Sequence, residues 1–69
     1  MTRKTEGSFT VTGNGLFRTA HSDRHGVSVA QSLASEQDRA ATFYVRDPLG
    51  TTLFVVERDK DGTVTTTER

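Results

Sequence analysis

The stretch that decides the fold is "ATFYVRDPLGTTLFVVERDKDGTVTTTE", residues 41–68. It holds three segments rich in β-branched and aromatic residues, and apolar and polar side chains alternate along them, as is typical of strands. The connecting sequences "DPLG" and "DKDG" carry the residues that favour tight turns. The last third of the chain is therefore predicted to be a three-stranded antiparallel meander.

The turns set the expected register of this meander. A four-residue loop at 47–50 would pair Arg46 with Thr51, and hence Phe43 with Phe54. A three-residue loop after Asp59 would place Val64 opposite Arg58. With this register the predicted core face of the meander consists of Phe43, Val45, Phe54, Val56 and Val64.

The opposite face of the meander carries Tyr44, Leu53 and Val55. Such a cluster is too apolar for a sheet surface left in water, so we expect something to cover it. Two covers are open: the N-terminal hairpin of the same chain, or a second copy of the protein.

The N-terminal third, "SFTVTGNGLFRTAH" (residues 8–21), alternates around Asn14-Gly15, a strong hairpin signal. A two-residue turn there predicts two sets of side chains on opposite faces. Phe9, Val11, Leu16 and Ala20 share one face, and Phe17 lies on the other with Thr10 and Thr12.

One helix is expected between the hairpin and the meander, ending near residue 38. Its apolar stripe, at helical spacing, is Val29, Ala30, Leu33 and Ala34. The start is open: Ser22 or Asp23 can cap an early first turn, and Ser28 with Gln31 forms a capping-box pattern. Gly26 would cost about 1 kcal/mol inside a first turn, so the later start is favoured.

These elements predict an α+β fold in one domain, residues 1–69: strand–strand–helix followed by a three-stranded antiparallel meander, with one helix packed on one sheet. Residues 1–7 are polar, and we expect them to be disordered. Hydrophobic residues make up 32% of 69 residues. A core this thin gains from contact with a partner.

Composition excludes several classes of protein. The chain has no cysteine, hence no disulfide, thiolate zinc site or cysteine nucleophile. Its longest apolar run, residues 53–56, is too short to span a membrane, and no apolar segment follows the basic start to make a secretory signal. The expected location is the cytoplasm.

The two histidines lie in "HSDRHG", residues 21–26. A metal site needs three or four ligands, and the chain offers no further histidine and no cysteine. We interpret the segment as a polar lead-in to the helix, in which the histidines have no chemical role. "DKDGT" (59–63) lacks the sixth-position glycine of a calcium loop, and "GNG" (13–15) lacks the helix that follows a phosphate-binding loop. No metal and no cofactor are therefore expected.

Nothing in the spacing specifies a catalytic site. Serine or threonine nucleophiles would need His21 or His25 as base, together with a third group to orient the base. The carboxylate pairs Glu36/Asp38 and Asp59/Asp61 fall on a solvent-facing helix end and in a turn. We expect a protein that is not an enzyme.

The leading hypothesis is a small interaction module that forms a homodimer through Tyr44, Leu53 and Val55. An unpaired edge strand, at residues 8–12 or 62–67, offers a second route to association. An adaptor or inhibitor of another protein would use the same apolar surface.

The alternative hypothesis is a nucleic-acid-binding regulator. Residues 1–35 carry Arg3, Lys4, Arg18 and Arg24 against Glu6 and Asp23, an excess of two positive charges, and Phe17 is available to stack on a base. The net charge of the whole chain is zero. This balance disfavours the alternative, because binding to phosphates depends on basic excess.

Overall fold

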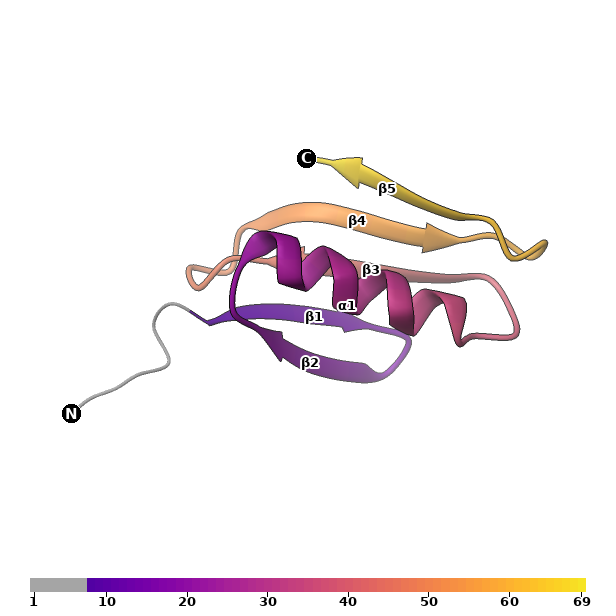
Figure 1. Ribbon diagram of the computed structural model, residues 1–69, viewed down its shortest axis with the longest axis horizontal. Helices are drawn as coiled ribbons and strands as arrows, with labels where there is room; N and C mark the ends of the chain where they lie inside the picture. Colours follow the sequence, from indigo (N-terminus) through magenta and orange to yellow (C-terminus); the bar gives the residue numbers. More distant parts are fainter. Residues whose placement is uncertain (1–7) are drawn as a thin grey trace.

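The computed structural model describes residues 8–69, which form five strands and one helix (Figure 1). In chain order these are β1 (Phe9–Gly13), β2 (Leu16–Ala20), α1 (Asp23–Ser35), β3 (Ala41–Arg46), β4 (Thr52–Arg58) and β5 (Val64–Glu68). The predicted α+β class and order of elements are confirmed. The expectation of disorder for residues 1–7 lies outside the described residues.

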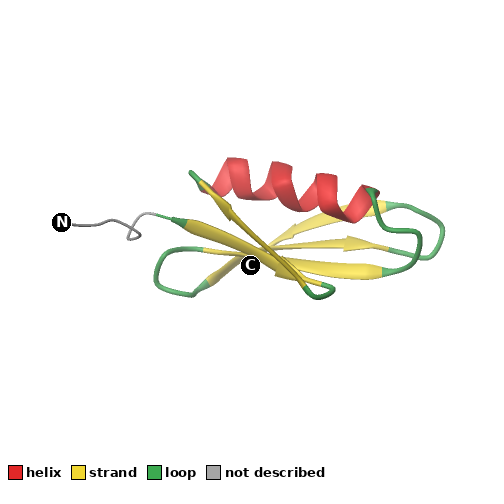
Figure 2. Ribbon diagram, turned by 90° about the horizontal axis from the view of Figure 1, so that it is seen from below, coloured by secondary structure: helices red, strands yellow, loops and turns green. Residues whose placement is uncertain are grey.

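All five strands belong to a single antiparallel sheet with the order β2-β1-β3-β4-β5. The hairpin joins the meander edge to edge, since β1 pairs with β3 through Thr10↔Arg46, Val11↔Val45 and Thr12↔Tyr44. Figure 2 shows α1 on one side of this sheet, and within residues 8–69 no helix or strand lies on the other side. The hairpin therefore extends the sheet and does not cover its second face, which rules out one of the two predicted covers. Residues 8–12, one of the two proposed edges, lie inside the sheet; β5 is an edge, as predicted.

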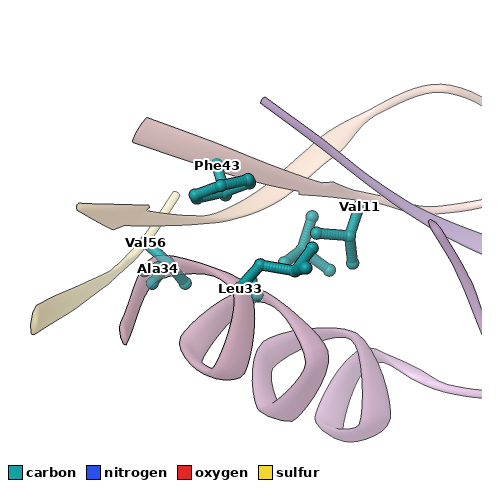
Figure 3. Packing of buried hydrophobic residues seen from close by; sticks show 7 residues of the cluster. Val11, Leu33, Ala34, Phe43 and Val56 are labelled. Atoms are coloured by element: carbon teal, nitrogen blue, oxygen red, sulfur yellow. The ribbon is translucent and has the colours of Figure 1, made fainter. Parts of the chain in front are cut away.

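The core lies between α1 and the sheet (Figure 3). The side chains of Val11, Phe43, Val45 and Val56 are fully buried. From the helix, Ala30, Leu33 and Ala34 close the cluster, and Val29 packs against its margin. The predicted helix stripe and the predicted core faces of the hairpin and the meander are thus confirmed. Each such apolar side chain contributes roughly 1.5–3 kcal/mol through burial.

The two meander turns, Asp47–Thr51 and Asp59–Thr63, have the same construction. In each, the amide of the aspartate donates to the carbonyl oxygen of the threonine, at 2.9 and 3.0 Å. The aspartate carboxylate accepts two backbone N–H groups within its own turn. The glycine adopts the left-handed conformation, with φ 91° at Gly50 and 95° at Gly62. The first loop therefore has three residues, and the prediction of a four-residue loop at 47–50 was wrong.

A β-bulge follows the first turn and changes the register of the meander. Arg46 pairs with Thr52, whereas Val45 pairs with Phe54, so Leu53 is the extra residue of β4. Phe43 consequently lies opposite Val56 and not opposite Phe54 as predicted. The shorter loop and the bulge each move the register by one residue. Beyond the bulge the total shift is even, so Leu53 and the residues after it in β4 stay on their predicted faces. Thr52, before the bulge, is shifted by one residue and lies with Arg46 on the open face.

The helix begins at Asp23, so the favoured later start near Ser28 was wrong. The side chain of Ser22 caps the helix by accepting a hydrogen bond from the amide of His25, at 3.1 Å. His25 reciprocates toward the incoming chain, since its Nδ1 accepts the amide of His21 at 3.0 Å. This arrangement resembles a capping box, with an imidazole in place of the usual glutamate or glutamine.

Gly26 explains why the early start is possible despite the propensity cost. It is buried in the first turn, and a Cβ at this position would lie 2.6 Å from Cγ1 of Val45. The absent side chain lets α1 approach β3 closely at this point. At its other end the helix stops at Ser35, before the predicted residue 38, where the side chain of Gln37 donates to the carbonyl of Leu33 at 3.0 Å.

Candidate functional site: the open face of the sheet

The sheet face opposite α1, here called the open face, is organised in rows that run across the strands. The central row takes one residue from each strand, because cross-strand partners share a face: Phe17, Thr12, Tyr44, Val55 and Thr67. Neighbouring strands are about 4.8 Å apart, so Phe17 and Tyr44 are separated by about twice that spacing. We call this set the aromatic row.

Two polar rows flank the aromatic row, one on each side. The arginine row consists of Thr19, Thr10, Arg46 and Thr52. The glutamate row consists of Thr42, Glu57 and Thr65. These rows therefore place one cation and one anion on opposite sides of an apolar centre, among threonine hydroxyls. On the side of the arginine row, Asp47 also lines a hollow with Thr10, Phe17 and Thr19.

Arg46 is held rigidly on this face. Its Nε donates to Oγ1 of Thr52 at 3.2 Å, and its Nη1 donates to Oγ1 of Thr12 at 3.0 Å. The guanidinium carbon lies 5.3 Å from the centre of the Tyr44 ring, within cation–π range. A guanidinium has five N–H donors, so these contacts leave donors for an acceptor above the face.

Glu57 is exposed between Thr42 and Thr65. The one ion pair among residues 8–69 joins Asp38 and Arg39 at 3.7 Å, in the exposed segment after α1. Within that part of the chain, neither Arg46 nor Glu57 has a partner of opposite charge. Both charges of the polar rows are thus available to another molecule.

The predicted apolar cluster does come together on the open face. Tyr44 and Val55 are cross-strand partners, and Leu53 lies on the same face because the next residue, Phe54, points to α1. Their exposure differs: Tyr44 is 36% exposed, Leu53 is partly buried, and Val55 is only 7% exposed. Val55 therefore packs against its neighbours on the open face and exposes little surface to a partner.

Phe17 is the residue that this prediction missed. It lies in the aromatic row, and its side chain is 58% exposed. The hairpin register already placed it on the face of Thr12, but its alignment with Tyr44 depends on the pairing of β1 with β3. No local signal in the sequence specifies that pairing. Arg46 was missed for the same reason, since Thr12 reaches it across the same pair of strands.

Within residues 8–69 the predicted nucleic-acid-binding residues Phe17, Arg18 and Arg24 do not lie together on one surface. Arg3 and Lys4 lie outside the described residues. Phe17 is on the open face, whereas Arg18 belongs to the face of α1, and its Nη1 donates to the carbonyl of Phe17 at 2.8 Å. Arg24 is exposed in the first turn of α1.

His21 precedes α1 and His25 lies in its first turn, so "HSDRHG" contains the start of the helix and is not only the polar lead-in that was predicted. Their rings stack with centroids 5.1 Å apart and planes inclined by 11°. In the part of the chain that the structure describes, no group of three or more histidine, cysteine, aspartate or glutamate side chains is placed to hold a metal ion. The stacked pair is a feature of helix capping.

Comparison of the chain with protein-family models, curated protein sequences and solved structures found no significant match. Among residues 8–69, no helix is long and apolar enough to cross a membrane.

Proposed function

We propose that the protein is a small, non-enzymatic interaction module that forms a homodimer through the open face. The observation that carries the proposal is the sheet itself: five strands have one face packed by α1 and the other face bare over residues 8–69. On that bare face Phe17 and Tyr44 are exposed in one row, beside Leu53. Exposed aromatic residues with an arginine are the composition that interface centres favour.

The chemistry of the open face supports binding rather than catalysis. The polar groups of its three rows are threonine hydroxyls, one guanidinium and one carboxylate. Both histidines are at the start of α1, and Nδ1 of His25 already accepts a hydrogen bond. The threonines of the open face therefore have no imidazole base to activate them. The proposed module works in the cytoplasm and needs no cofactor.

The test is the mass in solution of the unmodified chain and of Leu53→Asp, measured by light scattering behind a sizing column. A carboxylate at this position would have to be desolvated in the dimer, so Leu53→Asp should remain monomeric at concentrations where the unmodified chain pairs. Leu49→Asp is the matched control, because Leu49 is 91% exposed in the β3–β4 turn.

Circular dichroism of each variant separates loss of pairing from loss of folding. A Leu53→Asp chain that stays folded and pairs as well as the Leu49→Asp control would contradict the proposal.

The alternative predicted from the sequence used Arg3, Lys4, Phe17, Arg18 and Arg24. A different form of it, with a single-stranded nucleic acid lying across the open face, is favoured by one observation: Phe17, Tyr44 and Arg46 share that face. Aromatic rings and arginine on a sheet suit base stacking. Titration with oligonucleotides at about 50 mM salt tests it where phosphate contacts are strongest. Absence of binding under those conditions would remove the alternative.

A further inference from the structure

We infer that two copies pair about a two-fold axis that runs along the aromatic row, so that Arg46 of each copy meets Glu57 of the other. This inference rests on the proposed homodimer and specifies its geometry. The occupant of the open face is thus a second copy of this chain, held in register by two reciprocal ion pairs.

The positions of the two charges within the sheet are the first argument. Arg46 comes two residues after Tyr44 on β3, and Glu57 comes two residues after Val55 on β4. Tyr44 and Val55 are cross-strand partners on antiparallel strands. The two charges therefore lie on opposite sides of the aromatic row, each about 7 Å from it along its strand.

A rotation of 180° about the aromatic row brings these charges together. In the resulting dimer, β3 of one copy faces β3 of the other and β4 faces β4, with the strands of the two copies running in opposite directions. The arginine row of each copy faces the glutamate row of the other. Arg46 then faces Thr42 of the second copy, with Glu57 of that copy one strand to the side, about 4.8 Å away. Facing sheets are about 10 Å apart, a gap that an arginine and a glutamate span together.

The other in-plane axis, parallel to the strands, gives the opposite electrostatics. It would set the arginine row against the arginine row of the second copy, and the glutamate row against its own equivalent. Like charges facing each other at an interface are strongly unfavourable. Charge complementarity therefore favours the axis along the aromatic row over an axis parallel to the strands.

The conformation of Arg46 is the second argument. Two threonine hydroxyls and the Tyr44 ring hold its guanidinium on the face before any partner arrives. A side chain that is already ordered loses less conformational entropy on binding. Glu57 lies exposed between two threonines, with no oppositely charged partner among residues 8–69.

The size of the open face bounds the expected affinity. Five strands spaced at about 4.8 Å, with about five residues each, give a projected face of roughly 24 by 17 Å. This is small beside the roughly 800 Å² per partner of a standard interface, so we expect weak pairing that depends on protein concentration. The experiment should therefore extend to hundreds of micromolar.

The test is a charge exchange with three samples: Arg46→Glu alone, Glu57→Arg alone, and a mixture of the two. Each variant alone places like charges at both contacts and should pair at least about 100-fold more weakly than the unmodified chain. In the mixture every contact again joins opposite charges, so a heterodimer should form at the concentration where the unmodified chain pairs. Arg39→Glu and Asp38→Arg are matched controls, exposed in the segment after α1, and should pair normally.

The outcomes separate this inference from the proposed function. If the unmodified chain pairs, and both single variants pair equally well, the homodimer stands and the reciprocal ion pairs are wrong. If the unmodified chain stays monomeric at all concentrations, both fail. Should Arg46→Glu not fold, Glu57→Gln and Glu57→Arg carry the test: the arginine variant must pair more weakly than the glutamine variant, and equal pairing would overturn the ion pair.

Discussion

The two faces of the sheet are built from the same five strands, yet they differ in what they contribute. On the face toward α1, Val11, Phe43, Val45 and Val56 have no exposed surface. On the open face, Phe17 and Tyr44 remain exposed, and most of the other positions are threonines. The comparison indicates that one face holds the fold together by burial, while the other is free to bind.

A matched pair of substitutions tests this division most strongly. Phe43→Ala empties a fully buried site on the face of α1 and should lower the free energy of unfolding by about 3–5 kcal/mol. Phe17→Ala removes the same ring from the open face, where it is 58% exposed, and should cost no more than about 0.5 kcal/mol in the monomer. Urea denaturation at low protein concentration measures both values. Equal losses would refute the division between the faces.

A smaller effect is expected where α1 approaches the sheet. Gly26→Ala places a Cβ 2.6 Å from Cγ1 of Val45. Overpacking costs about 1–3 kcal/mol and the helix-propensity gain is about 1 kcal/mol, so a net loss of up to about 2 kcal/mol is expected. In a Val45→Ala background the clash is absent, and Gly26→Ala should be neutral or stabilising. The denaturant midpoints of the unmodified chain, the two single variants and the double variant give the coupling free energy between positions 26 and 45. Additive effects would show that the contact with Val45 does not restrict the side chain at position 26.

The smallest effect concerns the helix start, which anchors the covered face. Ser22→Ala removes the side-chain acceptor for the amide of His25 and should cost about 1 kcal/mol. Ser28→Ala, in the exposed part of α1, is the matched control and should change stability by less than about 0.5 kcal/mol. Thermal or urea unfolding compares them. A larger loss of stability for Ser28→Ala than for Ser22→Ala would support a helix that begins near Ser28.

Local patterns in the sequence predicted the elements and the faces. The hairpin register follows from the two-residue turn at Asn14-Gly15, and the residues predicted to share each face do so. Val64 opposite Arg58 follows equally from the three-residue turn after Asp59. In both cases the determining residues are close together along the chain.

Contacts between distant residues were not predictable in this way. The pairing of β1 with β3 joins segments on either side of the helix, and it alone turns the hairpin into part of the sheet. The fit of Gly26 against Val45 likewise overrode the propensity argument for a later helix start. The bulge at Val45/Arg46 altered the register, and Thr52 lies on the face of Arg46, while the apolar residues of β4 kept their predicted faces. The aromatic row and the arrangement of Arg46 became visible only once these contacts were known.

The central claim is that the open face binds a second copy, and the mass of the unmodified chain in solution tests it most directly. Light scattering over a range from a few to several hundred micromolar should show the mass rising from 7.6 kDa toward twice that value. A mass of 7.6 kDa at every concentration would contradict the claim.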